Sequence, residues 1–172
     1  KLVRLRNINH KLFKMKKILL VIAMSLFFVN LKAQKSSGII KDNDQLSVTI
    51  KKMNESYANN QHQLWDEKLS DDAKVYLNNT LVDGKTVKEI FKSHHTIFND
   101  IQIVDIYVHT NYFERDEIWS NNWFTWMGTG NKTGIRFSNR AHFDFKWENG
   151  KIIELLCYFD STGLNMEFAA ID

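Results

Sequence analysis

The segment His142–Asp160, HFDFKWENGKIIELLCYFD, contains the strongest local constraint on how this chain folds. Its Asn149-Gly150 pair lies between two runs of alternating residues, a pattern typical of a hairpin with a two-residue turn. Such a turn pairs Trp147 with Ile152, and the pairing continues outward from there. Because directly paired side chains lie on the same side of a sheet, the turn assigns every residue of the hairpin to one of two faces.

The two predicted faces differ in polarity. The first face, which the rest of the chain should cover, carries Ala141, Phe143, Phe145, Trp147, Ile152, Glu154, Leu156, Tyr158 and, at its end, Asp160. The second carries Arg140, His142, Asp144, Lys146, Ile153, Leu155, Cys157 and Phe159. This second face is too apolar for a free surface. We therefore expect a homodimer that forms through it, with His142, Ile153, Leu155 and Phe159 at the contact.

Asp160 is the candidate catalytic residue. On the covered face, near the open end of the sheet, its carboxylate should lose hydration and its pKa should rise, which suits a general acid or base. The alternative is a structural role, in which Asp160 ends the strand and stabilises a turn with Ser161-Thr162-Gly163.

The N-terminal part of the sequence predicts export. From Met15, MKKILLVIAMSLFFVNLKAQ has two lysines, an apolar run and a cleavage site after Ala33, as in a secretory signal peptide over residues 15–33. The apolar run is too short to cross a bilayer of about 30 Å, although an N-terminal membrane anchor is the alternative. We interpret residues 1–14 as an upstream segment translated in error, 34–41 as a flexible lead-in and 42–172 as one domain. The mature chain should be periplasmic or secreted, without membrane association.

Charge and motifs exclude several functions. All 20 acidic residues follow Ala33 but only 15 of the 23 basic ones do, so the mature net charge is 15 − 20 = −5. An acidic domain without a basic stripe does not suit nucleic acid. The single Cys157 excludes an internal disulfide, and no phosphate-binding or metalloprotease motif is present, so we expect no cofactor and no metal. Adjacent His94 and His95 diverge by about 100° on a helix and cannot share one ion; His94 should be a core histidine.

The remaining pattern predicts an α+β fold. Leu46, Ile50, Met53 and Tyr57 have helical spacing, and Gln61–Leu69 can form another turn or two. A short strand over 73–77 and a turn region over 78–84 precede a second helix, which begins at a capping box, Thr86-Val-Lys-Glu89. Long β-branched and aromatic strands then follow over 101–113, 118–129, 135–147 and 151–160. Helices followed by a meander predict helices packed on one curved antiparallel sheet.

Three segments, GKTVKEIFKSHHTIFNDI, WFTWMGTGNKTG and FKWENGKIIELLCYFD, resemble in order and spacing the SnoaL-like branch of the NTF2-like superfamily. The resemblance implies a cone in which N-terminal helices pack on a strongly curved antiparallel sheet and enclose a pocket. Members include polyketide cyclases, ketosteroid isomerases and domains that only bind or associate. Asp160 matches the strand-terminal acid/base of the cyclases. Their partner histidine does not carry over, because the hairpin places His142 on the outer face.

The residues expected to line a ligand pocket are Tyr57, Trp65, Tyr107, His109, Trp126 and Tyr158. Core packing is the alternative for the aromatic residues, and Tyr107 and His109 lie outside the cone if the valines between them face the core. Trp123 and Trp126 point to opposite faces of their strand, so only one of them can line the pocket. Three functions remain open: binding of a small, largely apolar molecule, a cyclase or isomerase that uses Asp160 on a carbon acid, and a structural association module.

Overall fold

The computed structural model describes residues 37–170, so the predicted upstream segment and signal peptide lie outside the described residues. Strand β1 (Gly38–Lys41) pairs with the end of strand β4. Residues 38–41 therefore belong to the sheet, where we predict a flexible lead-in. None of the helices within residues 37–170 has the length and apolar character needed to cross a membrane.

Within residues 37–170, four helices accompany the sheet: α2 (Gln45–Ala58), α3 (Gln63–Lys68), α4 (Gly84–Ile97) and α5 (Thr162–Ala169). Helix α2 has the predicted buried face, which includes Ile50 and Met53. Helix α4 begins before the predicted capping box, because the Asp83 carboxylate accepts a hydrogen bond from the Thr86 amide at 2.7 Å and serves as the N-cap.

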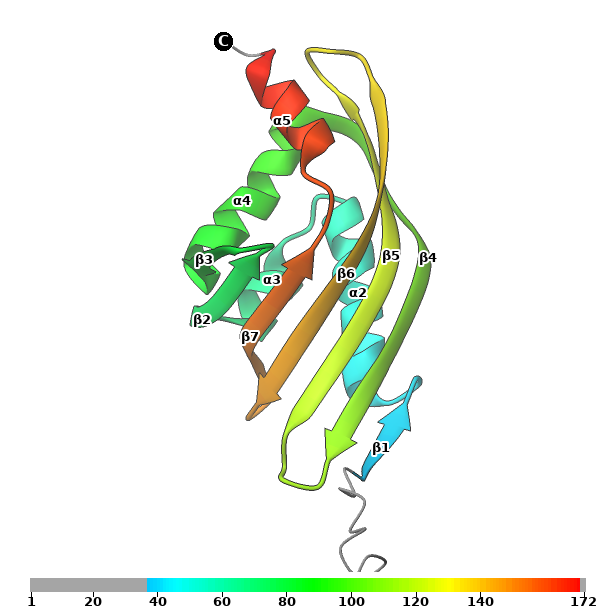
Figure 1. Ribbon diagram of the computed structural model, residues 1–172, viewed down its shortest axis with the longest axis vertical. Coiled ribbons are helices and arrows are strands. Elements are labelled where there is room, and N and C mark those ends of the chain that lie inside the picture. Colours follow the sequence, from blue (N-terminus) through cyan, green and yellow to red (C-terminus); the bar gives the residue numbers. More distant parts are fainter. Residues whose placement is uncertain (1–36, 171–172) are drawn as a thin grey trace, which may run out of the picture. The chain divides into compact units, whose positions relative to one another are not determined.

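The sheet has seven strands in the order β1-β4-β5-β6-β7-β2-β3. The other strands are β2 (Leu69–Leu77), β3 (Thr80–Asp83), β4 (Phe98–Phe113), β5 (Ile118–Gly130), β6 (Arg136–Glu148) and β7 (Lys151–Tyr158). All neighbours are antiparallel except β2 and β7, which run parallel, so the sheet is mixed rather than wholly antiparallel. The long strands β4, β5 and β6 are curved, and α2, α3 and α4 pack against the sheet (Figure 1). The observed class is the predicted α+β fold.

The β6–β7 hairpin has the predicted turn but not the predicted register. Asn149 and Gly150 both have positive φ, 49° and 74°, and Trp147 pairs with Ile152. Beyond this pair Lys146 faces Glu154, so Ile153 is an extra residue on β7. A bulge of this kind moves every later side chain of β7 to the opposite face.

Burial explains the bulge. Without it, the Glu154 carboxylate would face Phe145, which has no exposed surface in the core. With it, Leu155 pairs with Phe145 and is itself completely buried, while Glu154 lies beside Lys146. The predicted dimer contact is therefore wrong at Leu155, which belongs to the core.

A buried chain of hydroxyl groups fixes α2 to the sheet. Trp147 Nε1 donates to Ser120 Oγ at 2.8 Å, and Ser120 Oγ lies 2.8 Å from Thr110 Oγ1. Thr110 Oγ1 lies 2.9 Å from Ser47 Oγ, which donates to the Lys41 carbonyl at 3.1 Å. Since the Lys41 carbonyl can only accept and the Trp147 indole can only donate, each hydroxyl accepts from one neighbour and donates to the next, which satisfies all three in the core.

Candidate functional site

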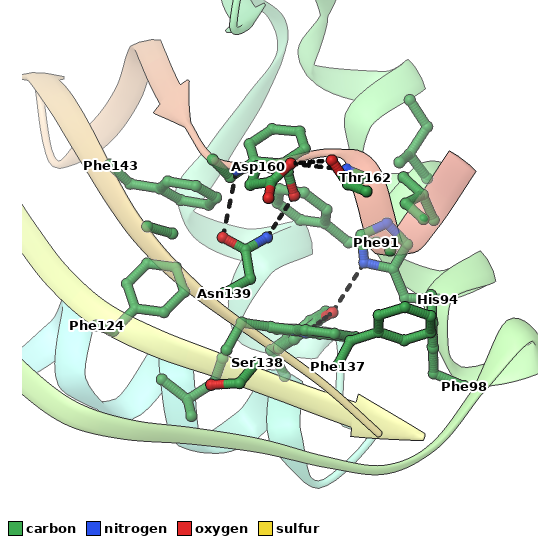
Figure 2. Close-up of a pocket in the computed structure, with 18 of the residues that line it drawn as sticks. Phe91, His94, Phe98, Phe124, Phe137, Ser138, Asn139, Phe143, Asp160 and Thr162 are labelled. Atoms are coloured by element: carbon green, nitrogen blue, oxygen red, sulfur yellow. Dashed lines mark hydrogen bonds between the residues drawn. The ribbon is translucent and has the colours of Figure 1, made fainter. Parts of the chain in front are cut away.

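A cavity of about 410 Å³ lies between the helices and the inner face of the sheet. Its walls come from helices α2, α3, α4 and α5, strands β2 and β4 to β6, and the segment after β7 (Figure 2). The lining is mostly apolar, and nine of its 23 residues are aromatic: Tyr57, Trp65, Phe91, Phe98, Phe124, Trp126, Phe137, Phe143 and Phe159. Several of these rings meet edge to face, such as Phe98 with Trp126 at 5.0 Å between centroids. This packing fixes the shape of the walls.

A hydrogen-bonded series crosses one wall of the cavity. Trp126 Nε1 on β5 donates to Tyr57 Oη on α2 at 3.0 Å. Tyr57 Oη lies 2.8 Å from Nδ1 of His94 on α4 (Figure 2). The other ring nitrogen of His94, Nε2, is buried and has no hydrogen-bond partner within the described part of the chain. Sequence analysis places His94 among core histidines, whereas the structure places it in the cavity wall.

Burial determines the protonation of these groups. Burial, together with a smaller effect of the neighbouring His95, lowers the pKa of His94 from 6.5 to about 4, so the ring is neutral at pH 7. Burial also raises the pKa of Tyr57, although the hydrogen bond from Trp126 acts in the opposite direction. The wall therefore presents neutral donors and acceptors and no charge.

Asp160 lies at the edge of the cavity, but its carboxylate is bound by its own chain. Its Oδ1 accepts hydrogen bonds from the Thr162 hydroxyl at 2.6 Å and the Thr162 amide at 2.8 Å. The Asn139 side chain holds the Asp160 backbone by donating to its carbonyl at 2.6 Å and accepting from its amide at 3.3 Å (Figure 2). The hydrogen bonds from Thr162 lower the pKa of Asp160, and the side chain is exposed. The predicted burial and raised pKa are therefore wrong, because the bulge and the turn into α5 re-aim this residue.

Helix α5 closes part of the cavity. Gly163, Leu164 and Met166 contribute to the lining, and Glu167 anchors the far end of the helix. The Glu167 carboxylate is inaccessible to solvent and accepts hydrogen bonds from the amides of Lys132 and Thr133 in the β5–β6 turn. Burial opposes ionisation of Glu167, but these hydrogen bonds outweigh it and the pKa is lowered.

The six predicted pocket residues divide into two groups. Tyr57, Trp65 and Trp126 line the cavity, and Trp123 faces the other way, as the strand alternation requires. Tyr107, His109 and Tyr158 lie on the outer face of the sheet instead. The bulge moves Tyr158 outward, and Val108 between Tyr107 and His109 is buried in the core. Phe159, which we predict at the dimer contact, lines the cavity.

The outer face carries a row of rings that crosses four strands. It consists of Tyr107, His109, Trp123, His142 and Tyr158, called here the outer aromatic row. Trp123 and His142 stack at 4.3 Å between centroids, and His109 stacks on the other side of Trp123 at 5.3 Å. His142 also lies 2.8 Å from an Asp144 oxygen. His142 is thus on the outer face, as predicted, and its acidic partner is Asp144 rather than Asp160.

Two cavity residues, His94 and Asn139, were not predicted as site residues. Helical spacing puts His94 on the apolar side of α4, which is a signal for burial but not for a cavity. Asn139 lies between Phe137 and Ala141 on the inner face of β6. A polar residue in such an apolar row is a sequence signal that could have indicated a cavity residue. Within residues 37–170, no group of three or more His, Cys, Asp or Glu side chains is arranged to hold a metal ion.

No protein-family model matches this sequence, and no curated protein matches it either. Solved structures do match. A provisionally assigned isomerase from Bacillus subtilis aligns with a TM-score of 0.57 at 12% identity, covering 72% of this chain and 91% of that one. A provisionally assigned SnoaL-like polyketide cyclase from Jannaschia sp. CCS1 has a TM-score of 0.54 at 14% identity, covering 76% and 98%.

An NTF2-like protein from Anabaena variabilis has a TM-score of 0.54 at 20% identity, with 69% of this chain and 88% of that one covered. At such identities the similarity concerns the fold and leaves the chemistry of the site to its own residues. The predicted fold is confirmed: this chain has an NTF2-like/SnoaL-like fold.

Proposed function

We propose that this protein binds a small, largely apolar molecule in the aromatic cavity. The observation that carries the proposal is the cavity itself, which has a volume of about 410 Å³ and a lining of nine aromatic side chains with few polar groups. Ligand sites typically have volumes of about 300–1,000 Å³, apolar walls and a small number of placed polar groups. A flat molecule with one or two rings matches these walls.

Binding can be tested with N-phenyl-1-naphthylamine, an apolar dye that fluoresces when it leaves water. We expect saturable binding that is lost in Ala141→Phe, because Ala141 is buried on the cavity wall and a phenyl ring there fills the space. The matched control is Arg140→Phe, which adds the same ring one residue away on the outer face. Equal dye binding in wild type and Ala141→Phe, with thermal unfolding showing both folded, would contradict the proposal.

A second candidate function is proton transfer by Asp160 at the carbon next to a carbonyl group. It is favoured by the position of Asp160 at the cavity edge and by structural neighbours that carry the names isomerase and polyketide cyclase. The lowered pKa makes Asp160 a weak base, which counts against it. The test is deuterium exchange into the methyl group of 2-acetylnaphthalene in D₂O, followed by NMR. Exchange that Asp160→Asn abolishes supports this function, and exchange no faster than in buffer removes it.

Association is a further proposal, with the outer aromatic row as the contact and a second copy of this chain as the partner. The row leaves an unusually large aromatic surface exposed: 57% of Tyr107, 38% of Trp123 and 48% of Tyr158. A two-fold axis through such a row would bury the same rings on both copies. Light scattering at micromolar concentration should give a dimer that Trp123→Lys dissociates and Thr129→Lys, on the same strand and face, does not. A monomeric wild type would rule this contact out.

Export is also proposed, on the signal peptide predicted over residues 15–33. Expression of the full chain in a Gram-negative host should give a mature protein that begins at Gln34 and leaves with the periplasmic fraction. Unprocessed protein in the cytoplasm would contradict it.

A further inference from the structure

The direction of the hydrogen bonds in the cavity wall fixes the tautomer of His94. An indole nitrogen can only donate, so Trp126 Nε1–H donates to the Tyr57 oxygen. The Tyr57 oxygen could still accept a second hydrogen bond from Nδ1–H of His94, 2.8 Å away, but the buried Tyr57 proton would then have no acceptor among the described residues. We therefore infer that the Tyr57 hydroxyl donates to Nδ1. A neutral imidazole that accepts at Nδ1 must carry its proton on Nε2. Trp126 therefore contributes to the proton position on His94 through Tyr57, because its N–H occupies one of the two acceptor sites of the Tyr57 oxygen.

The proton so placed has no partner in the described chain. His94 Nε2 is buried, makes no hydrogen bond within the described residues and belongs to a side chain that lines the cavity. In Figure 2 a dashed line runs from one ring nitrogen of His94, the Nδ1 that contacts Tyr57, and none runs from the other. A buried N–H without an acceptor is costly, which makes an acceptor on the ligand favourable at this point.

The charges around the cavity restrict what that acceptor is. Among the described residues that line the cavity, Asp160 is the only charged one, and no lysine or arginine is present. A ligand carboxylate or phosphate would lose its hydration without gaining a cation, which is strongly unfavourable. A neutral oxygen such as a ketone, aldehyde or ester carbonyl needs only a donor.

We propose that the cavity binds an apolar molecule bearing a carbonyl or similar neutral acceptor, which accepts a hydrogen bond from Nε2–H of His94. This inference rests on the proposed function, since it names the ligand class of the same cavity. It assigns His94 as the residue that orients the ligand, with Tyr57 and Trp126 as positioning residues.

The first experiment reads the tautomer directly. Long-range ¹H–¹⁵N correlation spectra of the protein at pH 7 distinguish a protonated from an unprotonated imidazole nitrogen, and comparison with His94→Phe assigns the signals. We expect His94 to carry its proton on Nε2. In Trp126→Phe the hydroxyl of Tyr57 is free to turn, and a mixture of tautomers should appear. A His94 proton on Nδ1 in the wild type would overturn the inference.

The second experiment compares two ligands of the same shape. 2-Acetylnaphthalene has a carbonyl oxygen where 2-isopropenylnaphthalene has a CH₂ group, so their affinity ratio in one protein isolates the acceptor. From wild type to His94→Phe this ratio should fall about three- to tenfold, as expected for one hydrogen bond. Because the Tyr57 hydroxyl loses its acceptor in that variant, Tyr57→Phe/His94→Phe is measured as well. Arg140→Phe, which changes the outer face of β6 and not the lining, should leave the ratio unchanged.

The outcomes separate the two proposals. If neither naphthalene binds, the proposed function fails and the inference falls with it. If both bind and the ratio is the same in wild type, His94→Phe and the double variant, the cavity binds ligands but His94 does not select them, and only the inference fails.

Discussion

The buried His94 should make the stability of this protein depend on pH in a defined window. In the folded chain its pKa is about 4, whereas an unfolded histidine has 6.5. Between pH 4 and pH 6.5, His94 is mostly protonated in the unfolded state and mostly neutral in the folded state. The stabilisation is therefore fully present above about pH 6.5 and is lost as the pH falls towards 4. At about 1.4 kcal/mol for each pH unit, the loss amounts to about 3 kcal/mol at pH 4 and about 2 kcal/mol at pH 5.

The assay is urea unfolding at pH 7, 6 and 5, followed by tryptophan fluorescence, for wild type and His94→Gln. Glutamine does not titrate, so the difference in unfolding free energy between the two proteins removes the contribution of all other groups. Between pH 7 and pH 5, we expect the unfolding free energy of the wild type to fall by about 2 kcal/mol relative to that of His94→Gln.

The matched control is His95→Gln. His95 is also shifted downward by burial, while its hydrogen bond to the Tyr57 carbonyl opposes the shift, and its shift is the smaller. The same difference should therefore change less for His95→Gln than for His94→Gln. A His94→Gln difference that stays constant within about 0.5 kcal/mol from pH 7 to pH 5 would refute the reasoning, since it would mean that His94 is protonated equally in both states.

Three further predictions concern the core and the cavity edge. Phe145→Ala should lower the free energy of unfolding by about 3–5 kcal/mol in urea titrations, because the ring has no exposed surface and the cavity left behind cannot collapse. The buried side chains of Asn54 and Asn122 form two hydrogen bonds with each other, of 3.2 and 3.1 Å. Asn122→Leu should therefore lower the free energy of unfolding by about 1–3 kcal/mol, measured by calorimetry. Changing both residues to leucine should lower it by less than the sum of the two single changes. The Asp160 carboxyl should titrate by NMR below its ordinary pKa of 3.8, and Thr162→Val should raise that pKa; a midpoint above 3.8 in the wild type would instead favour acid–base chemistry.

The lowered pKa of Asp160 changes how the cavity is interpreted. A carboxylate that is fully ionised at neutral pH repels anions at the cavity edge, and its hydrogen bonds to Thr162 hold it in place. The polar group that faces the interior is instead the neutral ring of His94. This arrangement suits selection of a neutral apolar ligand better than proton transfer by the strand-terminal acid.

The sequence by itself determined the parts of this protein that depend on neighbouring residues. The apolar spacing from Leu46 to Tyr57 marks α2, because residues three and four apart share one side of a helix. Asn149-Gly150 marks the hairpin, because both positions of its turn need positive φ. Strand alternation also placed Trp123 and Trp126 on opposite sides of β5.

Only the tertiary structure decided which residues face the cavity. Alternation along β7 holds until one extra residue enters, and the bulge at Ile153 depends on the cost of placing Glu154 against Phe145 from another strand. The contact between Tyr57 and His94 joins two helices that are 37 residues apart in the chain. No local pattern encodes such a contact, because it arises when both helices pack on the same sheet. The candidate site is therefore a product of packing: the sequence supplied its aromatic residues and its histidine, and the fold gave that histidine a tautomer and a direction.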